Sequence, residues 1–203
     1  MLIIASPAIV FASSGIIDLA SSFNHWLIPE GSWLESVFKP AELAAENMVQ
    51  VLLGEGSDNY LALAFFSITI LPAICEEFVF RGVLQPLLSK QLRNVHLGIW
   101  ISAAIFSAIH FQFYGFLPRL LLGVILGYLV FWSGSLWTAV IAHFANNSIA
   151  FWMFRYYGAA ETPEGSVQGQ WYFTLSITLL FGSLIYWFYK TGKTAGYHTD
   201  YTS

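Results

Sequence analysis

The stretch from Leu61 to Arg93 places charged side chains inside a run that otherwise has the composition of a membrane-spanning helix. Residues 60–73 are nearly all apolar and residues 82–88 are mostly so, whereas Glu76, Glu77 and Arg81 lie between them. An ionisable side chain at the centre of a bilayer costs about 3 kcal/mol on insertion scales, so such residues mark a functional site by default. We therefore expect the rest of the chain to be organised around these three residues.

The spacing of the three charges assigns them different roles. Glu76 and Glu77 are successive, so they diverge by about 100° around a helix with ~3.6 residues per turn. Arg81 lies four residues after Glu77 on the same face, where the order Glu before Arg favours an ion pair. Glu76 is left without a local partner. We predict that Glu77 and Arg81 form a supporting pair and that Glu76 carries the chemistry.

The composition is that of a polytopic membrane protein. Of 203 residues, 57% are hydrophobic and only 10% are charged, well outside the norm for soluble domains. The net charge of −4 is spread thinly without a basic stripe, so nucleic-acid binding has no support. The single cysteine, Cys75, excludes an internal disulfide.

The hydrophobic runs predict an all-α transmembrane bundle of about six spans, with a catalytic cavity between its central helices. The expected spans are residues 2–19, 61–91, 97–111, 116–132, 136–154 and 171–189. Residues 1–203 are expected to form one membrane-embedded domain with its core at 61–154. An extramembrane segment at 21–60 is expected to carry one amphipathic helix near Pro40–Leu53, and a polar tail at 191–203 is expected to be disordered. Pro72 and Pro86 should kink or bound the central helix.

Two further patterns concern packing and orientation. Gly123 and Gly127 form a GxxxG pair, which predicts close helix packing. Lys90, Arg93, Lys190 and Lys193 fall on one side of the expected up-and-down path. Cytoplasmic loops carry an excess of Lys and Arg, so we expect the turn at Lys90 and the C-terminus in the cytoplasm. No positively charged segment precedes the first apolar run, so a cleaved signal peptide is not expected.

Three more polar groups lie at depths that become compatible with that of Glu76 if the lower end of the central helix, which is too long for a bilayer, protrudes from it. At about 1.5 Å per residue, Glu76 and His110 both lie roughly 22 Å from the expected cytoplasmic ends of their helices. His143 and Asn147 are four residues apart, share a helix face and lie roughly 12–18 Å above their turn. Phe106 shares a face with His110 and can fix the orientation of its ring. We predict that Glu76, His110, His143 and Asn147 line one cavity.

This set of side chains is suited to hydrolysing acyl bonds in two ways. Glu76, helped by a histidine, can act as general base on a water while Asn147 donates to the developing oxyanion. Alternatively, Glu76, His110 and His143 can hold a zinc ion with water in the open fourth position. The sequence contains no HExxH, and its three aspartates all lie outside the core spans. These absences argue against a metalloprotease of that motif and against an intramembrane aspartyl protease.

The three polar segments together resemble a known signature. Glu76-Glu77-x-x-x-Arg81, Phe106-x-x-x-His110 and His143-x-x-x-Asn147 are similar, in order and in full, to the three motifs of the CAAX-protease and bacteriocin-processing family. The resemblance covers roughly Leu61–Phe154 and implies an intramembrane endopeptidase, a hydrolase of the bacterial inner membrane with its cavity open towards the cytoplasm. It also implies that Glu76 is the catalytic carboxylate, that His110, His143 and Asn147 complete the site, and that Glu77, Arg81 and Phe106 support it.

The substrate and two rival functions stay open at this point. We expect a peptide or protein substrate delivered at or within the lipid bilayer, of lipidated or bacteriocin-like type. One rival is a non-catalytic scaffold or immunity protein that uses the same polar cluster to bind a partner. A second rival is a transporter, which would be expected to show repeated halves with broken helices, and the sequence shows none.

Overall fold

The computed structural model describes residues 1–53, 58–157 and 171–194, and every regular element in these ranges is a helix. The prediction of an all-α fold is therefore confirmed. The helices outside the central span are α1 (Leu2–Ala12), α2 (Ser14–Leu27), α3 (Trp33–Leu53), α7 (Val95–Ala108), η3 (Phe113–Gly115), α8 (Phe116–Ser133), α9 (Leu136–Tyr157) and α10 (Trp171–Thr194). The predicted polar tail begins inside α10, and the rest of it lies outside the described residues.

The central span is one long helix that contains two π-helical segments. It comprises α4 (Asp58–Phe65), η1 (Phe66–Ile70), α5 (Leu71–Glu77), η2 (Phe78–Leu84) and α6 (Gln85–Leu92). The segment η1 ends two residues before Pro72, and η2 ends two residues before Pro86. Proline lacks the N–H of an α-helical turn and crowds the carbonyl four residues earlier, and a π turn accommodates both defects. The prolines thus bound segments of the helix without ending it, and η2 begins directly after Glu76 and Glu77.

The first predicted span is a bent pair of helices rather than one rod. α1 and α2 meet at Ser13 with a bend of 42°. The Ser13 hydroxyl donates to the carbonyl oxygen of Val10 at 2.7 Å, which competes with regular helical bonding at this point. α2 then continues to Leu27, beyond the predicted end of the apolar run.

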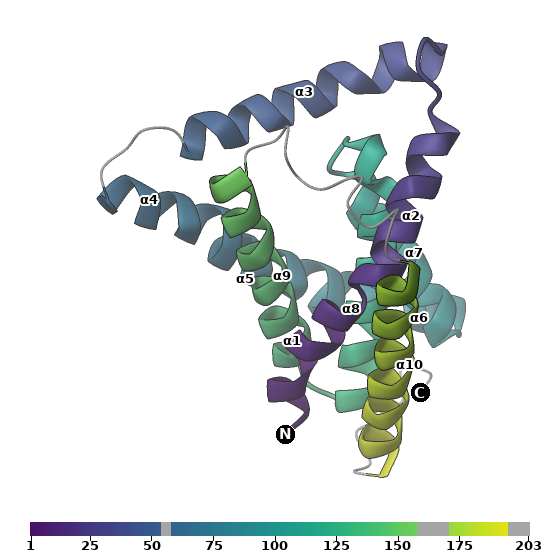
Figure 1. The fold of residues 1–203 in the computed structure, drawn as a ribbon. Coiled ribbons are helices and arrows are strands. Elements are labelled where there is room, and N and C mark those ends of the chain that lie inside the picture. Colours follow the sequence, from purple (N-terminus) through teal and green to yellow (C-terminus); the bar gives the residue numbers. More distant parts are fainter. Residues whose placement is uncertain (54–57, 158–170, 195–203) are drawn as a thin grey trace.

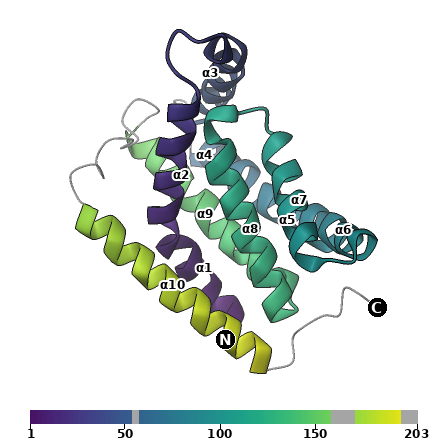
Figure 2. The ribbon, with the colours of Figure 1, turned by 90° about the vertical axis from the view of Figure 1, so that its right-hand side faces the viewer.

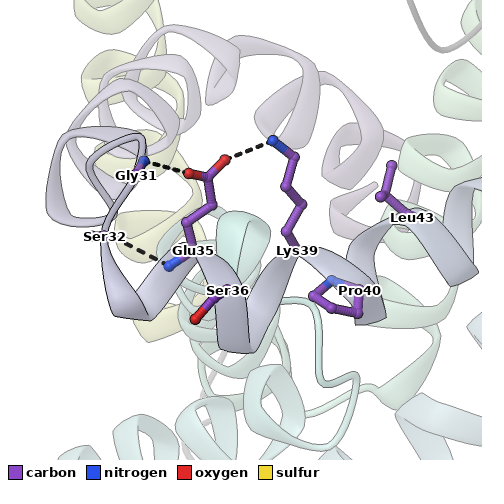
Figure 3. Close-up of a pocket in the computed structure, with 7 residues that line it drawn as sticks. All are labelled: Gly31, Ser32, Glu35, Ser36, Lys39, Pro40 and Leu43. Atoms are coloured by element: carbon purple, nitrogen blue, oxygen red, sulfur yellow. Dashed lines mark hydrogen bonds and ion pairs between the residues drawn. The ribbon is translucent and has the colours of Figure 1, made fainter.

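The amphipathic helix begins earlier than the sequence analysis predicted. α3 starts at Trp33, because Ser32 Oγ accepts from the Glu35 N–H at 3.2 Å and Glu35 Oε2 accepts from the Gly31 N–H at 2.6 Å. Glu35 also pairs with Lys39 at 2.6 Å, and this hydrogen bond lowers the pKa of the Glu35 carboxyl (Figure 3). The sequence Ser32-x-x-Glu35 is the signature of such a capped start, which the analysis overlooked. Pro40 lies inside α3 rather than at its start.

α1, α8, α9 and α10 enclose the largest apolar core (Figures 1 and 2). Its fully buried members include Ile9, Leu126, Leu129 and Phe188. The central helix packs on α9 and on α7, and α3 lies along the top of the molecule in Figure 1. The polar residues of the site therefore lie where the central helix meets α7, α8 and α9.

The predicted count of six spans is not confirmed. Among the described residues, the helices that are long and apolar enough to cross a membrane are Tyr60–Leu92, Phe113–Ser133 and Tyr172–Gly192, and α1 with α2 adds a fourth if the bent pair is one span. α7 is apolar but short, and α9, which carries His143 and Asn147, is not in this set. Composition and length alone thus support three or four spans.

A tight turn joins the central helix to α7. Arg93 ends α6 in the left-handed conformation at φ 50°, and Asn94 Oδ1 accepts from the N–H groups of His96 and Leu97 to cap α7. Immediately beyond, Gly98 lies so close to α6 that a Cβ atom there would stand 2.7 Å from the backbone nitrogen of Ser89. The absence of a side chain at Gly98 therefore sets the distance between the two helices.

We expect Gly98→Ala to lower the stability of the protein by about 1–3 kcal/mol, because the backbone of α6 cannot yield as a flexible side chain would. The measurement is unfolding in detergent, followed by tryptophan fluorescence. Gly182→Ala is the matched control, since a Cβ atom at Gly182 meets nothing within 4 Å. Equal stability of the two variants would show that the α6–α7 distance does not depend on Gly98.

Candidate active site

A single carboxylate oxygen of Glu77 holds the polar site together. Glu77 is fully buried, and its Oε1 atom accepts from Arg81 Nη1 at 2.7 Å and from His143 Nδ1 at 2.7 Å. The pair of Glu77 with Arg81 follows from their spacing along the helix, whereas the bond to His143 joins the central helix to α9. Glu77 Oε2 has no hydrogen-bond partner among the described residues. The two hydrogen bonds to Oε1 therefore offset most of the free-energy cost of burying this charge.

Glu76 faces the same histidine from the other side. Its Oε2 atom lies 3.8 Å from His143 Nε2, and the Glu76 side chain is 28% exposed, in contrast to that of Glu77. His143 donates from Nδ1 to the Glu77 carboxylate, and its Nε2 atom faces Glu76; in the neutral ring with this tautomer, Nε2 carries the lone pair. A separation of 3.8 Å is too long for a direct hydrogen bond and is of the size that a bridging water spans.

Phe106 on α7 packs against every other aromatic or cationic member of the site. Its ring meets those of His110 and His143 edge-on, with centroids 5.0 and 6.0 Å apart. The Arg81 guanidinium carbon lies 4.7 Å from the centre of the same ring, and Phe80 packs edge-on at 5.0 Å. Phe106 is almost completely buried, so it fixes the distance between the two histidines.

His110 and Asn147 belong to the same region, but within the described part of the chain no hydrogen bond or ion pair joins either of them to Glu76. His110 donates from Nδ1 to the carbonyl oxygen of Phe106 at 2.7 Å, because a carbonyl can only accept. In the neutral ring with this tautomer, the Nε2 atom carries the lone pair. Asn147 lies one turn beyond His143 on α9, and within the described part of the chain the one hydrogen bond of its side chain is a long contact of 3.5 Å, in which its Oδ1 accepts from Asn146 Nδ2.

Glycines on α8 allow the central helix to approach its backbone. The carbonyl oxygen of Gly123 accepts from Arg81 Nη2 at 3.1 Å, and that of Gly127 accepts from Gln85 Nε2 at 3.3 Å. A Cβ atom at Gly123 would lie 3.3 Å from the same Arg81 nitrogen, and one at Gly127 would lie 2.8 Å from Gln85 Oε1. The predicted close packing at the GxxxG pair is confirmed, and the pair also exposes two carbonyl acceptors to buried side chains.

The loop between α7 and α8 ties the site to the N-terminal helices. Ser107 donates to the carbonyl oxygen of Phe116 at 2.7 Å, so its hydroxyl has a structural role. Asn24 on α2 donates to the carbonyl oxygen of Phe113 at 2.6 Å and accepts from the N–H of Leu117 at 3.0 Å. These bonds hold the segment that follows His110.

The loop also lies beside a charge that was not among the predicted site residues. Arg119 lies in the first turn of α8, inside a predicted span, and donates to the backbone and side-chain oxygens of Gln112 at 3.3 and 3.1 Å. Gln112 in turn donates to Glu42 on α3 at 3.4 Å. Burial raises the pKa of the Glu42 carboxyl, and the charge of Arg119 is the largest opposing effect. The criterion that singled out Glu76, a charge within an apolar run, also applies to Arg119.

The surface hollow drawn in Figure 3 lies elsewhere. It is open, and Gly31, Ser32, Glu35, Ser36, Lys39, Pro40 and Leu43 line it at the start of α3. Its polar groups are those that cap and stabilise α3, and none of the predicted site residues is among them. We therefore assign the candidate active site to the buried cluster around Glu77 and not to this hollow.

The three predicted zinc ligands meet only part of what a metal site requires. Both histidines have Nδ1 engaged and Nε2 free, as metal-binding histidines commonly do. In residues 1–53, 58–157 and 171–194, however, no three His, Cys, Asp or Glu side chains lie close enough to hold one ion. Glu76, His110 and His143 are therefore not gathered as a ligand set in this conformation.

Comparison with known proteins supports the resemblance inferred from the three motifs. Residues 58–149 match the family described as type II CAAX prenyl endopeptidase Rce1-like. All three motifs lie inside this Rce1-like segment, which is slightly less than half of the chain, and the predicted resemblance is confirmed. The apolar helices and the Rce1-like match together indicate an integral membrane protein whose residues 58–149 are similar to the CAAX-type prenyl endopeptidases.

A relative in Bacillus subtilis (strain 168), the uncharacterized protein YpbD, is 33% identical over 86 residues. The match covers 40% of this chain and 41% of YpbD, so the chain matches less than half of the length of that relative. No solved structure matches the chain.

We expect Arg81→Ala to destabilise the protein by about 3–5 kcal/mol, because the change leaves the buried Glu77 charge with one donor fewer. The measurement is denaturant or thermal unfolding of the purified protein in detergent.

The double variant Glu77→Gln with Arg81→Ala is the matched control. The amide oxygen at position 77 still accepts from His143, but no charge is buried. The double variant should therefore be more stable than Arg81→Ala alone. An Arg81→Ala protein as stable as the wild type would refute the supporting role of this pair.

Proposed function

We propose that this protein is an intramembrane endopeptidase in which Glu76 activates a water molecule for attack on a peptide carbonyl. The observation that carries the proposal is the 3.8 Å separation of Glu76 Oε2 from His143 Nε2, with the opposite nitrogen of the ring bound to Glu77. With the His143 ring neutral and protonated on Nδ1, two acceptors face each other at a distance that accommodates one water. The Glu76 side chain is 28% exposed and that of His143 is 5% exposed.

In the proposed mechanism the water donates one hydrogen to Glu76 and the other to His143 Nε2. Its lone pair is then free to attack the carbonyl carbon, and Glu76 takes the proton as general base. Glu76 subsequently returns this proton to the leaving amine. Glu77 and Arg81 keep the His143 ring oriented throughout, and Phe106 holds it apart from His110.

The remaining predicted residues have roles at the substrate. The side-chain amide of Asn147 is available to donate to the oxyanion, since within the described chain it is engaged only by Asn146. His110, held by its bond to Phe106, offers a second acceptor at Nε2.

The substrate proposed is a peptide delivered from the membrane, of lipidated or bacteriocin-like type. The matched family is described by its action as a CAAX prenyl endopeptidase, which makes a prenylated peptide the first substrate to test. We place the protein in a bacterial plasma membrane with the Lys90 turn and the site opening on the cytoplasmic side, as the distribution of Lys and Arg favours.

Activation of the water by a zinc ion is an alternative mechanism for the same proposed function. An ion held by Glu76, His110 and His143 would activate water and polarise the carbonyl. Zinc analysis of purified wild type beside the double variant His110→Ala with His143→Ala tests it. About one zinc per chain that disappears in the double variant would support this version.

We expect Glu76→Gln to reduce peptide cleavage in proteoliposomes by about 10²–10⁴-fold, the usual contribution of a general base. Cleavage is measured by mass spectrometry of prenylated and unprenylated peptides, and folding is measured by thermal unfolding. Glu30→Gln, which changes an exposed carboxylate at the surface, should cleave as the wild type does.

The rival function as a scaffold or immunity protein makes the opposite prediction. A wild type that binds a membrane peptide without cleaving it, and a Glu76→Gln variant that binds equally well, would favour the scaffold. Unchanged cleavage by a folded Glu76→Gln variant would refute the role of Glu76 as the base.

A further inference from the structure

Arg119 is a cation in an unfavourable position. It is partly buried in the first turn of α8, within a helix that is long and apolar enough to span a membrane. The N-terminal end of a helix carries the positive end of the helix dipole, so a cation is disfavoured there. Such a placement is expected to be retained only where the charge has a partner or a function.

The partners of Arg119 among the described residues are all neutral. Its two terminal nitrogens donate to the two oxygens of Gln112, and no carboxylate lies within ion-pair distance in the ranges 1–53, 58–157 and 171–194. A guanidinium has five N–H groups, so most of its donor capacity is unused. Gly115 lies beside the group, where an added Cβ atom would stand 3.1 Å from Arg119 Nη2.

The guanidinium is held beside the segment that carries one of the proposed catalytic residues. Gln112, which accepts from both of its terminal nitrogens, follows His110 by two residues. A planar fork of N–H donors in such a position matches the two oxygens of a carboxylate.

We propose that Arg119 is a specificity-determining residue that binds a carboxylate of the substrate peptide near the scissile bond. This inference rests on the proposed function and deepens it. The carboxylate has two chemical sources, the C-terminus of the peptide and an acidic side chain close to it. Both present the same planar pair of oxygens to Arg119.

Charge balance with Glu42 is the alternative explanation for the position of Arg119. The Gln112 side chain lies between the two charges, because its amide donates to Glu42 and its oxygen accepts from Arg119. Glu42 Oε2 is buried without a hydrogen-bond partner in the described part of the chain. If Arg119 serves only as the counter-charge of Glu42, its loss affects stability and not the choice of substrate.

The test uses four prenylated peptides that end in Cys-aliphatic-aliphatic-X. They combine a free or amidated C-terminus with Glu or Gln as the last residue, so the two sources of the carboxylate are separated. In proteoliposomes, Arg119→Gln should raise KM by about 10- to 100-fold for peptides that carry the recognised carboxylate, the value of one charge-assisted hydrogen bond. The turnover number kcat should change little, and the peptide that lacks both carboxylates should be unaffected.

Two variants serve as controls. Arg93→Gln removes the same charge at the exposed α6–α7 turn and should leave all four KM values unchanged. Arg119→Lys should restore part of the preference, because it keeps the charge and loses the fork.

Three results would overturn the inference. One is a wild type that cleaves all four peptides alike, and another is an Arg119→Gln variant with the preference of the wild type. The third is a uniform loss of cleavage together with lower stability, which would identify Arg119 as the counter-charge of Glu42.

Binding to the Glu76→Gln protein separates this inference from the proposed function. Tighter binding of the carboxylate-bearing peptides, lost on adding Arg119→Gln, supports the role of Arg119 even if no peptide is cleaved, in which case the proposed function alone fails. Equal binding of all four peptides contradicts it.

Discussion

The buried carboxylate of Glu77 is the interaction on which the rest of the site depends. A single oxygen accepts from Arg81 on its own helix and from His143 on α9, so one carboxylate orients both a guanidinium and a histidine ring. Such a charge is stable only while its donors remain in place. Burial of this charge therefore orients the His143 ring, because the ring can move only if Glu77 loses one of its two hydrogen bonds.

The surrounding fold serves this contact through close backbone approaches. Gly123 on α8 leaves room for Arg81 to reach a carbonyl oxygen, and Gly98 on α7 brings that helix against α6. Phe106, also on α7, then packs between the two histidine rings. The π turn that starts after Glu77 accommodates Pro86 without ending the helix, so the charged residues stay within one continuous span.

The parts of this arrangement that were predictable are those encoded by local spacing. The Glu77–Arg81 pair follows from a separation of four residues, and the all-α class follows from the apolar runs. The bond from His143 to Glu77 joins residues 66 positions apart, so periodicity within one helix could not reveal it. The early start of α3 depended on the Ser32–Glu35 cap, a local signal that was present and overlooked. The span count was not confirmed because α7 has only 14 residues and because α9 carries several polar residues, which lower its hydropathy.

The most direct test of the account is the protonation of the His143 ring in the membrane-embedded protein. Solid-state NMR of ¹⁵N-labelled histidine, assigned with a His143→Gln variant, distinguishes the two ring nitrogens. The account predicts a proton on Nδ1, hydrogen-bonded to Glu77, and an unprotonated Nε2, with the Nδ1 signal shifted in Glu77→Gln. A neutral ring protonated on Nε2 would contradict it, because no lone pair would then face Glu76.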